Sequence, residues 1–112
     1  MTASMVMEVS GKKRIVDPTD QDIRDCLAAF DDYTVDRGEA FLVLGPTDMT
    51  YIQTSGDKEN GFDVEYQEGD TEHHYRAARA DFGLDEVARM LLAFRDGNPD
   101  WKNMAQWERS RW

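Results

Sequence analysis

The sequence predicts an α+β domain: an antiparallel β-meander sheet, two main helices packed on one face of it, and a Trp-rich C-terminal segment. Short apolar runs alternate with polar residues, as in residues 62–67 (FDVEYQ), and this is typical of strands with one face in the core. Two other segments, one after Asp17 and one after Gly83, repeat apolar residues at helical spacing. All three tryptophans fall within the last twelve residues, so we expect that segment to dock on the domain.

Length and composition limit the class of protein. The 112 residues have the size of one domain, 1–112, and the 40% of apolar residues suffices for one core. A single cysteine, Cys26, excludes a disulfide-stapled scaffold. Residues 1–8 lack the apolar stretch of a signal peptide, and no segment approaches the ~20 apolar residues of a membrane span. We therefore expect a cytoplasmic protein.

Charge is unevenly distributed along the chain. The net charge of −10 argues against binding to nucleic acid or to an anionic membrane, because both attract basic patches. Residues 17–72 hold sixteen Asp or Glu against three bases, a net of −13. This acidic surface has two interpretations: it keeps a small protein soluble, or it is a docking face for a basic partner.

The N-terminal segment predicts a β-hairpin. Residues 5–9 and 12–16 flank a two-residue turn at 10–11, which sets Glu8 opposite Lys13.

A helix is predicted next, with Asp17 as N-cap and Pro18 as the first helical residue. Its buried stripe consists of Ile23, Cys26, Leu27, Phe30 and Tyr33. Its acidic residues outside that stripe are Asp22, Asp25, Asp32 and Asp36.

Three strands are predicted in the middle of the chain. Residues 40–44 have no polar alternation and end at Gly45-Pro46, so they predict a central strand buried on both faces. Residues 49–54 form the next strand, and the polar connection 55–60 leads to the strand at 62–67.

A two-residue loop at Gly69-Asp70 predicts the register of the following hairpin. The expected pairs are Gln67 with Glu72, Tyr66 with His73, Glu65 with His74, Val64 with Tyr75, and Asp63 with Arg76. This register places the aromatic and aliphatic residues on one face and sets two carboxylates opposite His74 and Arg76 on the exposed face.

The second helix follows Gly83, carries Arg95 in its last turn and is stopped by Gly97 and Pro99. We expect one core shared by Phe30, Phe41, Val43, Val64, Val87 and Leu91. Trp101 and Trp107 are interpreted as a packed C-terminal cap, with a partner-binding surface as the alternative. Trp112 is the least constrained of the three.

No segment carries a recognisable catalytic signature. His73 and His74 are neighbours on a predicted strand and point to opposite faces, so regular β geometry prevents them from chelating one metal. A site made of His74 with Glu65 and Asp63 would offer only one nitrogen ligand. Cys26 falls on the apolar stripe of a helix, where an inert thiol is the usual outcome. We therefore predict no catalytic, cofactor-binding or metal-binding residues, and no enzyme activity.

Several segments look like a known family: FLVL (41–44), TYIQT (50–54), FDVEY (62–66), HYRA (74–77) and LDEV (84–87), with Trp101 and Trp107. Together they resemble the Imm1-type immunity proteins, small bacterial antidotes encoded beside polymorphic toxins. The resemblance covers roughly residues 15–109, and Glu65 is the best single match. The N-terminal hairpin is not part of it.

The resemblance implies a non-catalytic protein that binds and neutralises a cognate toxin domain, often one that acts on nucleic acid. A basic protein partner fits the acidic stretch, and the predicted contacts are Asp22, Asp25, Asp32, Asp63, Glu65 and His74. The alternative is a structural or regulatory interaction domain that pairs with another protein of its own cell or with itself. A carboxylate-rich enzyme or metal binder is a third, weaker hypothesis.

Overall fold

The computed structural model describes residues 4–9, 13–29, 41–47, 49–57, 59 and 61–109. Its described strands form one seven-stranded antiparallel sheet with the order β2-β1-β3-β4-β5-β6-β7. The strands are β1 (Val6–Val9), β2 (Lys13–Val16), β3 (Phe41–Thr47), β4 (Thr50–Asp57), β5 (Gly61–Gln67), β6 (His74–Ala77) and β7 (Trp107–Arg109). The predicted α+β class and its antiparallel sheet are confirmed.

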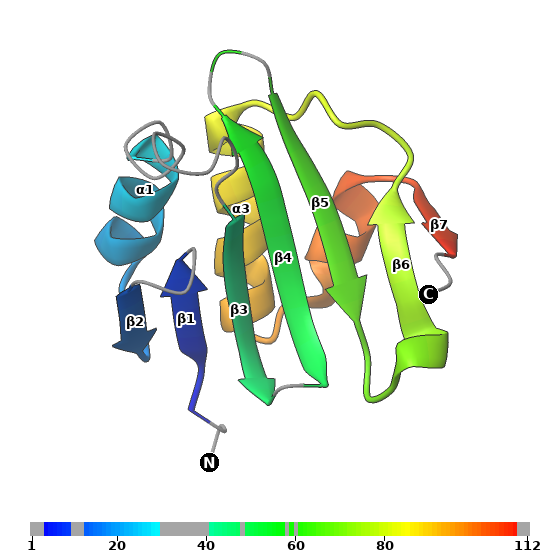
Figure 1. Cartoon of the computed structure of the whole chain (residues 1–112), viewed down its shortest axis with the longest axis horizontal. Helices are drawn as coiled ribbons and strands as arrows, with labels where there is room; N and C mark the ends of the chain where they lie inside the picture. The colour runs from blue at the N-terminus through cyan, green and yellow to red at the C-terminus, as the bar shows by residue number, and fades with distance from the viewer. Residues whose placement is uncertain are drawn as a thin grey trace.

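The helices pack on one face of this sheet (Figure 1). The two main helices are α1 (Asp20–Ala28) and α3 (Leu84–Arg95), and two short 3-10 helices are η1 (Thr71–His73) and η2 (Pro99–Met104). Helix α3 lies behind β3, β4 and β5, with α1 and η2 beside it. No helix among the described residues is long and apolar enough to cross a membrane.

The core lies between the sheet and α3. Val64, Val87 and Leu91 are fully buried and share it, as predicted. Phe41 and Val43 do not: they alternate with the buried Leu42 and Leu44 and point to the opposite face, where Phe41 is 37% exposed. The prediction that this strand is buried on both faces is therefore wrong, because no described helix covers the second face. Phe30 lies outside the described residues.

Helix α1 begins later than predicted. Its N-cap is Thr19, whose hydroxyl accepts from the Asp22 N–H at 3.1 Å while the Asp22 carboxylate accepts from the Thr19 N–H at 2.9 Å. This reciprocal capping box is more favourable than the predicted start, in which Asp17 is the N-cap and Pro18 the first helical residue. Asp17 instead adopts a positive φ of 52° and accepts from the Met5 N–H at 2.9 Å, so it joins β1 to the segment after β2. Of the predicted stripe, Ile23, Cys26 and Leu27 are buried, while Phe30 and Tyr33 lie outside the described residues.

The N-terminal hairpin exists, but its register differs by one residue. Glu8 pairs with Arg14 rather than Lys13, and Val9 pairs with Lys13. Strand β2 begins at Lys13, so the connection holds residues 10–12 and not the two residues expected. A register shift by an odd number of residues moves the side chains of a strand to the opposite face of the sheet. Here it places Arg14 on the same side of the sheet as Glu8.

The β5–β6 hairpin is displaced by two residues from its predicted register. Glu65 pairs with Arg76, Tyr66 with Tyr75 and Gln67 with His74. The cause is Asp70, whose carboxylate caps η1 by accepting from the N–H groups of Glu72 and His73 at 3.0 and 3.1 Å. Residues expected to pair with β5 form this 3-10 turn instead. Because the shift is even, the strand residues keep their predicted faces except Glu72 and His73, which lie in η1.

The C-terminal segment packs on the domain, as predicted. Trp101 is buried and contacts Tyr66, Phe94 and Trp107 edge to face, with ring centroids 4.7, 5.4 and 5.9 Å apart. The indole of Trp107 donates to the Lys102 carbonyl at 2.9 Å. Burial raises the pKa of Tyr66 to about 12. Residues 107–109 add the seventh strand, which the sequence analysis did not predict, and Trp112 lies outside the described residues.

The packing of α3 is testable through Leu91, which is fully buried. Replacing Leu91 with Ala should lower the free energy of unfolding by about 2–5 kcal/mol, because it removes buried methyl groups and leaves a cavity. Urea denaturation measures this loss. Arg89→Ala, an exposed change on the same helix, is the control, and a loss under about 1 kcal/mol for Leu91→Ala would contradict the packing.

Two helix-start carboxylates predict how stability depends on pH. The backbone hydrogen bonds from Thr19 and Gly83 hold the pKa of Asp22 and of Glu86 below their ordinary values of 3.8 and 4.5. Lowered pKa values in the folded state add stability that is present at neutral pH and is lost as the pH falls below those ordinary values. Denaturant unfolding at pH 7 and pH 3 should show this loss. The double variant Asp22→Asn, Glu86→Gln should show less of it than Asp25→Asn, and equal losses would contradict the assignment.

Candidate partner-binding site

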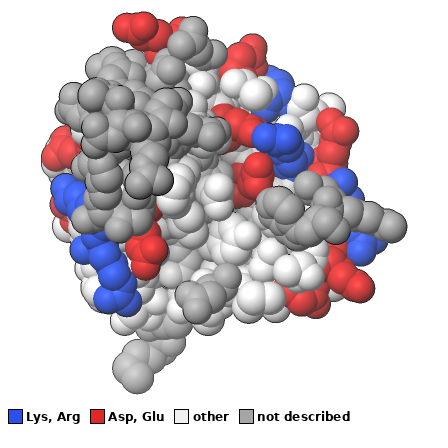
Figure 2. All heavy atoms as spheres, viewed as in Figure 1, with Lys and Arg blue, Asp and Glu red and all other residues white. Residues whose placement is uncertain are grey.

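The sheet face opposite the helices, here the open face, carries the polar residues of interest. Strand alternation and pairing place on it Val6, Glu8, Arg14, Val43, Tyr51, Gln53, Asp63, Glu65, Gln67, His74 and Arg76. Figure 2 shows this face: uncharged residues form its middle, and charged side chains gather on either side. On this face, the described charged side chains of β1, β2, β5, β6 and β7 are four acids (Glu8, Asp63, Glu65, Glu108) and two bases (Arg14, Arg76).

One side of the open face holds a cluster of Asp63, Glu65, His74 and Arg76, here the carboxylate cluster. The Arg76 guanidinium donates to Asp63 Oδ2 from Nε at 3.0 Å and from Nη2 at 2.6 Å, and Nη2 lies 3.6 Å from Glu65 Oε1. These hydrogen bonds and charges raise the pKa of Arg76. The side chains of Asp63 and Glu65 are only 14% and 20% exposed, so the carboxylates are held in fixed positions rather than free in solvent.

His74 lies beneath this cluster and is 1% exposed, so the expectation of an exposed side chain there is wrong. Its Nε2 lies 3.0 Å from Glu65 Oε2 and its Nδ1 lies 3.3 Å from Gln67 Oε1. The Gln67 amide is oriented by Nε2, which donates to the Met49 carbonyl at 3.0 Å. These two contacts are to oxygens, and the tautomer of the ring decides which nitrogen donates.

The predicted contacts Glu65–His74 and Asp63–Arg76 are both present, although neither pair is directly opposite in the sheet. The two-residue displacement makes them diagonal neighbours. Long side chains still reach across that diagonal.

His73 points elsewhere. Its Nδ1 lies 2.7 Å from Asp70 Oδ1 in the exposed turn of η1. Within the part of the chain that the structure describes, no group of three or more His, Cys, Asp or Glu side chains is placed to hold a metal ion. The thiol of Cys26 is buried in the helix layer, and burial raises its pKa.

Asp63 has one unsatisfied atom. Its Oδ1 is buried and, among the described residues, has no hydrogen-bond partner, whereas Oδ2 accepts both bonds from Arg76. A buried acceptor without a donor costs about 1–3 kcal/mol. Asp63 also borders a cavity of about 480 Å³ that Arg76, Arg79, Glu108 and Arg109 line with three alanines, 77, 78 and 80.

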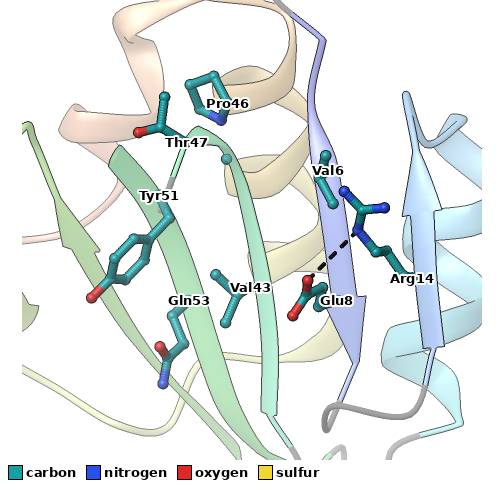
Figure 3. A pocket seen from close by; sticks show the side chains of 9 residues that line it. Val6, Glu8, Arg14, Val43, Pro46, Thr47, Tyr51 and Gln53 are labelled. Atoms are coloured by element: carbon teal, nitrogen blue, oxygen red, sulfur yellow. Dashed lines mark ion pairs between the residues drawn. The ribbon is translucent and has the colours of Figure 1, made fainter. Parts of the chain in front are cut away.

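The middle of the open face is hollowed. A cavity of about 370 Å³, here the central hollow, is drawn in Figure 3, and its lining residues are Val6, Glu8, Arg14, Val43, Gly45, Pro46, Thr47, Tyr51 and Gln53. Val6, Val43 and Pro46 supply its apolar surface. Tyr51 and Gln53 lie on one side of it, and the Glu8–Arg14 pair, 3.7 Å apart, lies on the other.

The backbone of β3 and the side chain of Tyr51 have special features where they line the central hollow. Strand β3 is irregular between Leu44 and Thr47, and a Cβ on Gly45 would collide with the Thr50 carbonyl, so only glycine fits there. Burial and the charge of Glu65 raise the pKa of Tyr51.

The six predicted contact residues fall into two separate places. Asp63, Glu65 and His74 come together on the open face, whereas Asp22 and Asp25 lie on α1 in the helix layer, on the other side of the sheet. Asp32 lies outside the described residues.

The central hollow itself was not predicted. The apolar run 41–44 has no polar alternation and therefore indicated burial on both faces, so it held no signal that Val43 lies on the open face.

Comparisons with protein-family models, with curated proteins and with solved structures found no match to this chain.

The carboxylate cluster predicts a contrast between the two histidines. His74→Ala should lower the free energy of unfolding by about 1.5–3 kcal/mol, because it removes a buried ring together with its contacts to the partly buried Glu65 Oε2 and to Gln67 Oε1. His73→Ala, an exposed change next to it, should have a much smaller effect. Urea denaturation of both variants tests this, and equal losses would show that the cluster does not stabilise the fold.

Proposed function

We propose that this protein is a non-catalytic, immunity-type protein that binds and neutralises a cognate bacterial toxin domain through an acidic surface. The observation that carries the proposal is the open face: Asp63 and Glu65 are fixed by Arg76 and His74 beside an unfilled hollow. The resemblance of the sequence to Imm1-type proteins points in the same direction.

The fixed carboxylates favour binding for an energetic reason. Ordering a flexible side chain at an interface costs about 0.5–1.5 kcal/mol, and that cost is already met in the folded chain for Asp63 and Glu65. A donor from a partner that reaches Glu65 therefore meets an acceptor that needs no reorganisation.

A basic partner suits the charge of the chain. The net charge of −10 accelerates encounter with a positively charged surface and disfavours acidic proteins. Proteins that act on nucleic acid contact phosphates with Lys and Arg, so an acidic protein seated on those residues would exclude the substrate. Neutralisation in this proposal is competition for the basic surface of the toxin and requires no chemistry by the bound chain.

Co-expression with the product of the adjacent gene tests the proposal. Growth should be rescued when that product is toxic, and the purified pair should associate. Exposed charges are screened beyond about 8 Å at physiological salt, so association should be at least several-fold slower at 0.5 M than at 0.05 M salt, with a smaller change in dissociation.

The other outcomes discriminate between the readings. A pair that associates equally fast at both salt concentrations would keep the partner and remove the acidic surface as the cause. Failure both to bind and to protect would reject the immunity function and favour a structural or regulatory interaction domain.

A further inference from the structure

We propose that the open face, and not the acidic surface of α1, is the docking surface, and that it takes an extended basic–apolar–basic segment of a protein partner. The apolar side chain enters the central hollow, and the two basic side chains reach Glu8 and Glu65. This inference rests on the proposed function only in taking the partner to be a protein.

One row of directly paired residues crosses all seven strands on the open face. From β2 to β7 it reads Arg14, Glu8, Val43, Gln53, Glu65, Arg76 and Glu108. Its middle consists of the uncharged residues Val43 and Gln53, and one glutamate flanks them on each side. An arginine lies next to each glutamate, on the side away from the middle. Directly paired residues project to the same face, so the row is one continuous strip of surface.

The middle of the row accepts an apolar group. Val43 and Gln53 both line the central hollow, and the adjacent Val6 and Pro46 extend its apolar surface. A hollow of about 370 Å³ has room for one large side chain, and filling it would remove apolar surface from water.

The glutamates on either side select basic groups. Glu8 contacts Arg14 only at 3.7 Å and has a side chain that is 53% exposed, so it has room for a second cation. The Oε1 atom of Glu65 lies 3.6 Å from Nη2 of Arg76, because the close hydrogen bonds of Arg76 go to Asp63. An acidic segment would meet like charge at both positions.

The spacing selects an extended segment. Neighbouring strands lie about 4.8 Å apart, so the three steps from Glu8 to Glu65 span about 14 Å. In an extended chain, residues i, i+2 and i+4 point to one face and cover about 13 Å. In an α-helix about nine steps, from residue i to i+9, cover that distance, and they turn the two end residues to opposite sides. The row therefore fits the pattern basic-x-apolar-x-basic, laid across the strands.

The first test uses peptides and needs no toxin. The probe is the capped peptide Lys-Thr-Leu-Thr-Arg, titrated into isotope-labelled protein at low salt and followed by NMR. Saturable shifts should appear at the amides of the row, around Val43, Gln53 and Glu65, and not on α1. The rearranged peptide Lys-Arg-Leu-Thr-Thr and the acidic peptide Glu-Thr-Leu-Thr-Glu should bind at least about tenfold more weakly. Equal binding of all three peptides, or shifts confined to α1, would overturn the proposal.

The second test uses matched variants. Gln53→Lys puts a positive charge in the middle of the row and should weaken binding of the probe peptide at least about tenfold. Gln21→Lys makes the same change on the exposed surface of α1 and should leave binding unchanged. Glu8→Gln, which alters only an exposed side chain, should weaken binding several-fold and covers the case in which Gln53→Lys disturbs the sheet.

The same variants separate this inference from the proposed function. If the adjacent gene product binds the protein and only Gln21→Lys weakens it, the immunity function stands and the docking surface is wrong. If the probe peptide binds as expected but the adjacent gene product does not, the docking surface stands and the immunity function is rejected.

Discussion

The structure depends on the burial of one face of a seven-stranded sheet by α1, α3 and η2, which lie on the same side. Alternate residues of β1, β3, β4 and β5 point into that layer, and the side chains buried there include Met7, Leu42, Ile52 and Val64. The residues between them necessarily project to the other side. A surface of partly exposed side chains is thus a direct consequence of how the core is built.

Order on the open face comes from polar contacts, since no described helix packs there. His74 connects Glu65 to Gln67, Gln67 binds the Met49 carbonyl, and Arg76 covers Asp63. Such a network is costly if a single member is missing, because each remaining group is then partly buried without a partner. The same network connects β5 to β6 and to Met49, which precedes β4, so the geometry of the surface and the stability of the sheet are linked through the same side chains.

The sequence predicts the faces of the strands better than it predicts their pairing. Phe62, Val64 and Tyr66 belong to the core, as their alternation indicated, and Glu65 and His74 meet as expected. The predicted register of the β5–β6 hairpin is wrong because Asp70 forms a helix cap in place of a two-residue turn. The predicted register of the N-terminal hairpin is wrong because its connection is one residue longer than expected. Turn chemistry depends on local hydrogen bonds that alternation does not encode. The fold class therefore followed from the pattern, whereas cross-strand neighbours required the structure.

The difference between strand faces and strand pairing explains which part of the candidate site could be predicted from the sequence. The carboxylate cluster depends mainly on which face a residue occupies, so an even displacement of the hairpin left it intact. The row from Arg14 to Glu108 depends on the β5–β6 pairing and on five further pairings between the other neighbouring strands. The odd displacement of the N-terminal hairpin alone makes the row unpredictable, because the expected register sets Lys13 rather than Arg14 beside Glu8. The row also carries an apolar centre between charged residues on a sheet face that no described helix covers. In the docking proposed above, the glutamates on either side of that centre meet the basic residues of the partner segment, and the hollow between them takes its apolar residue.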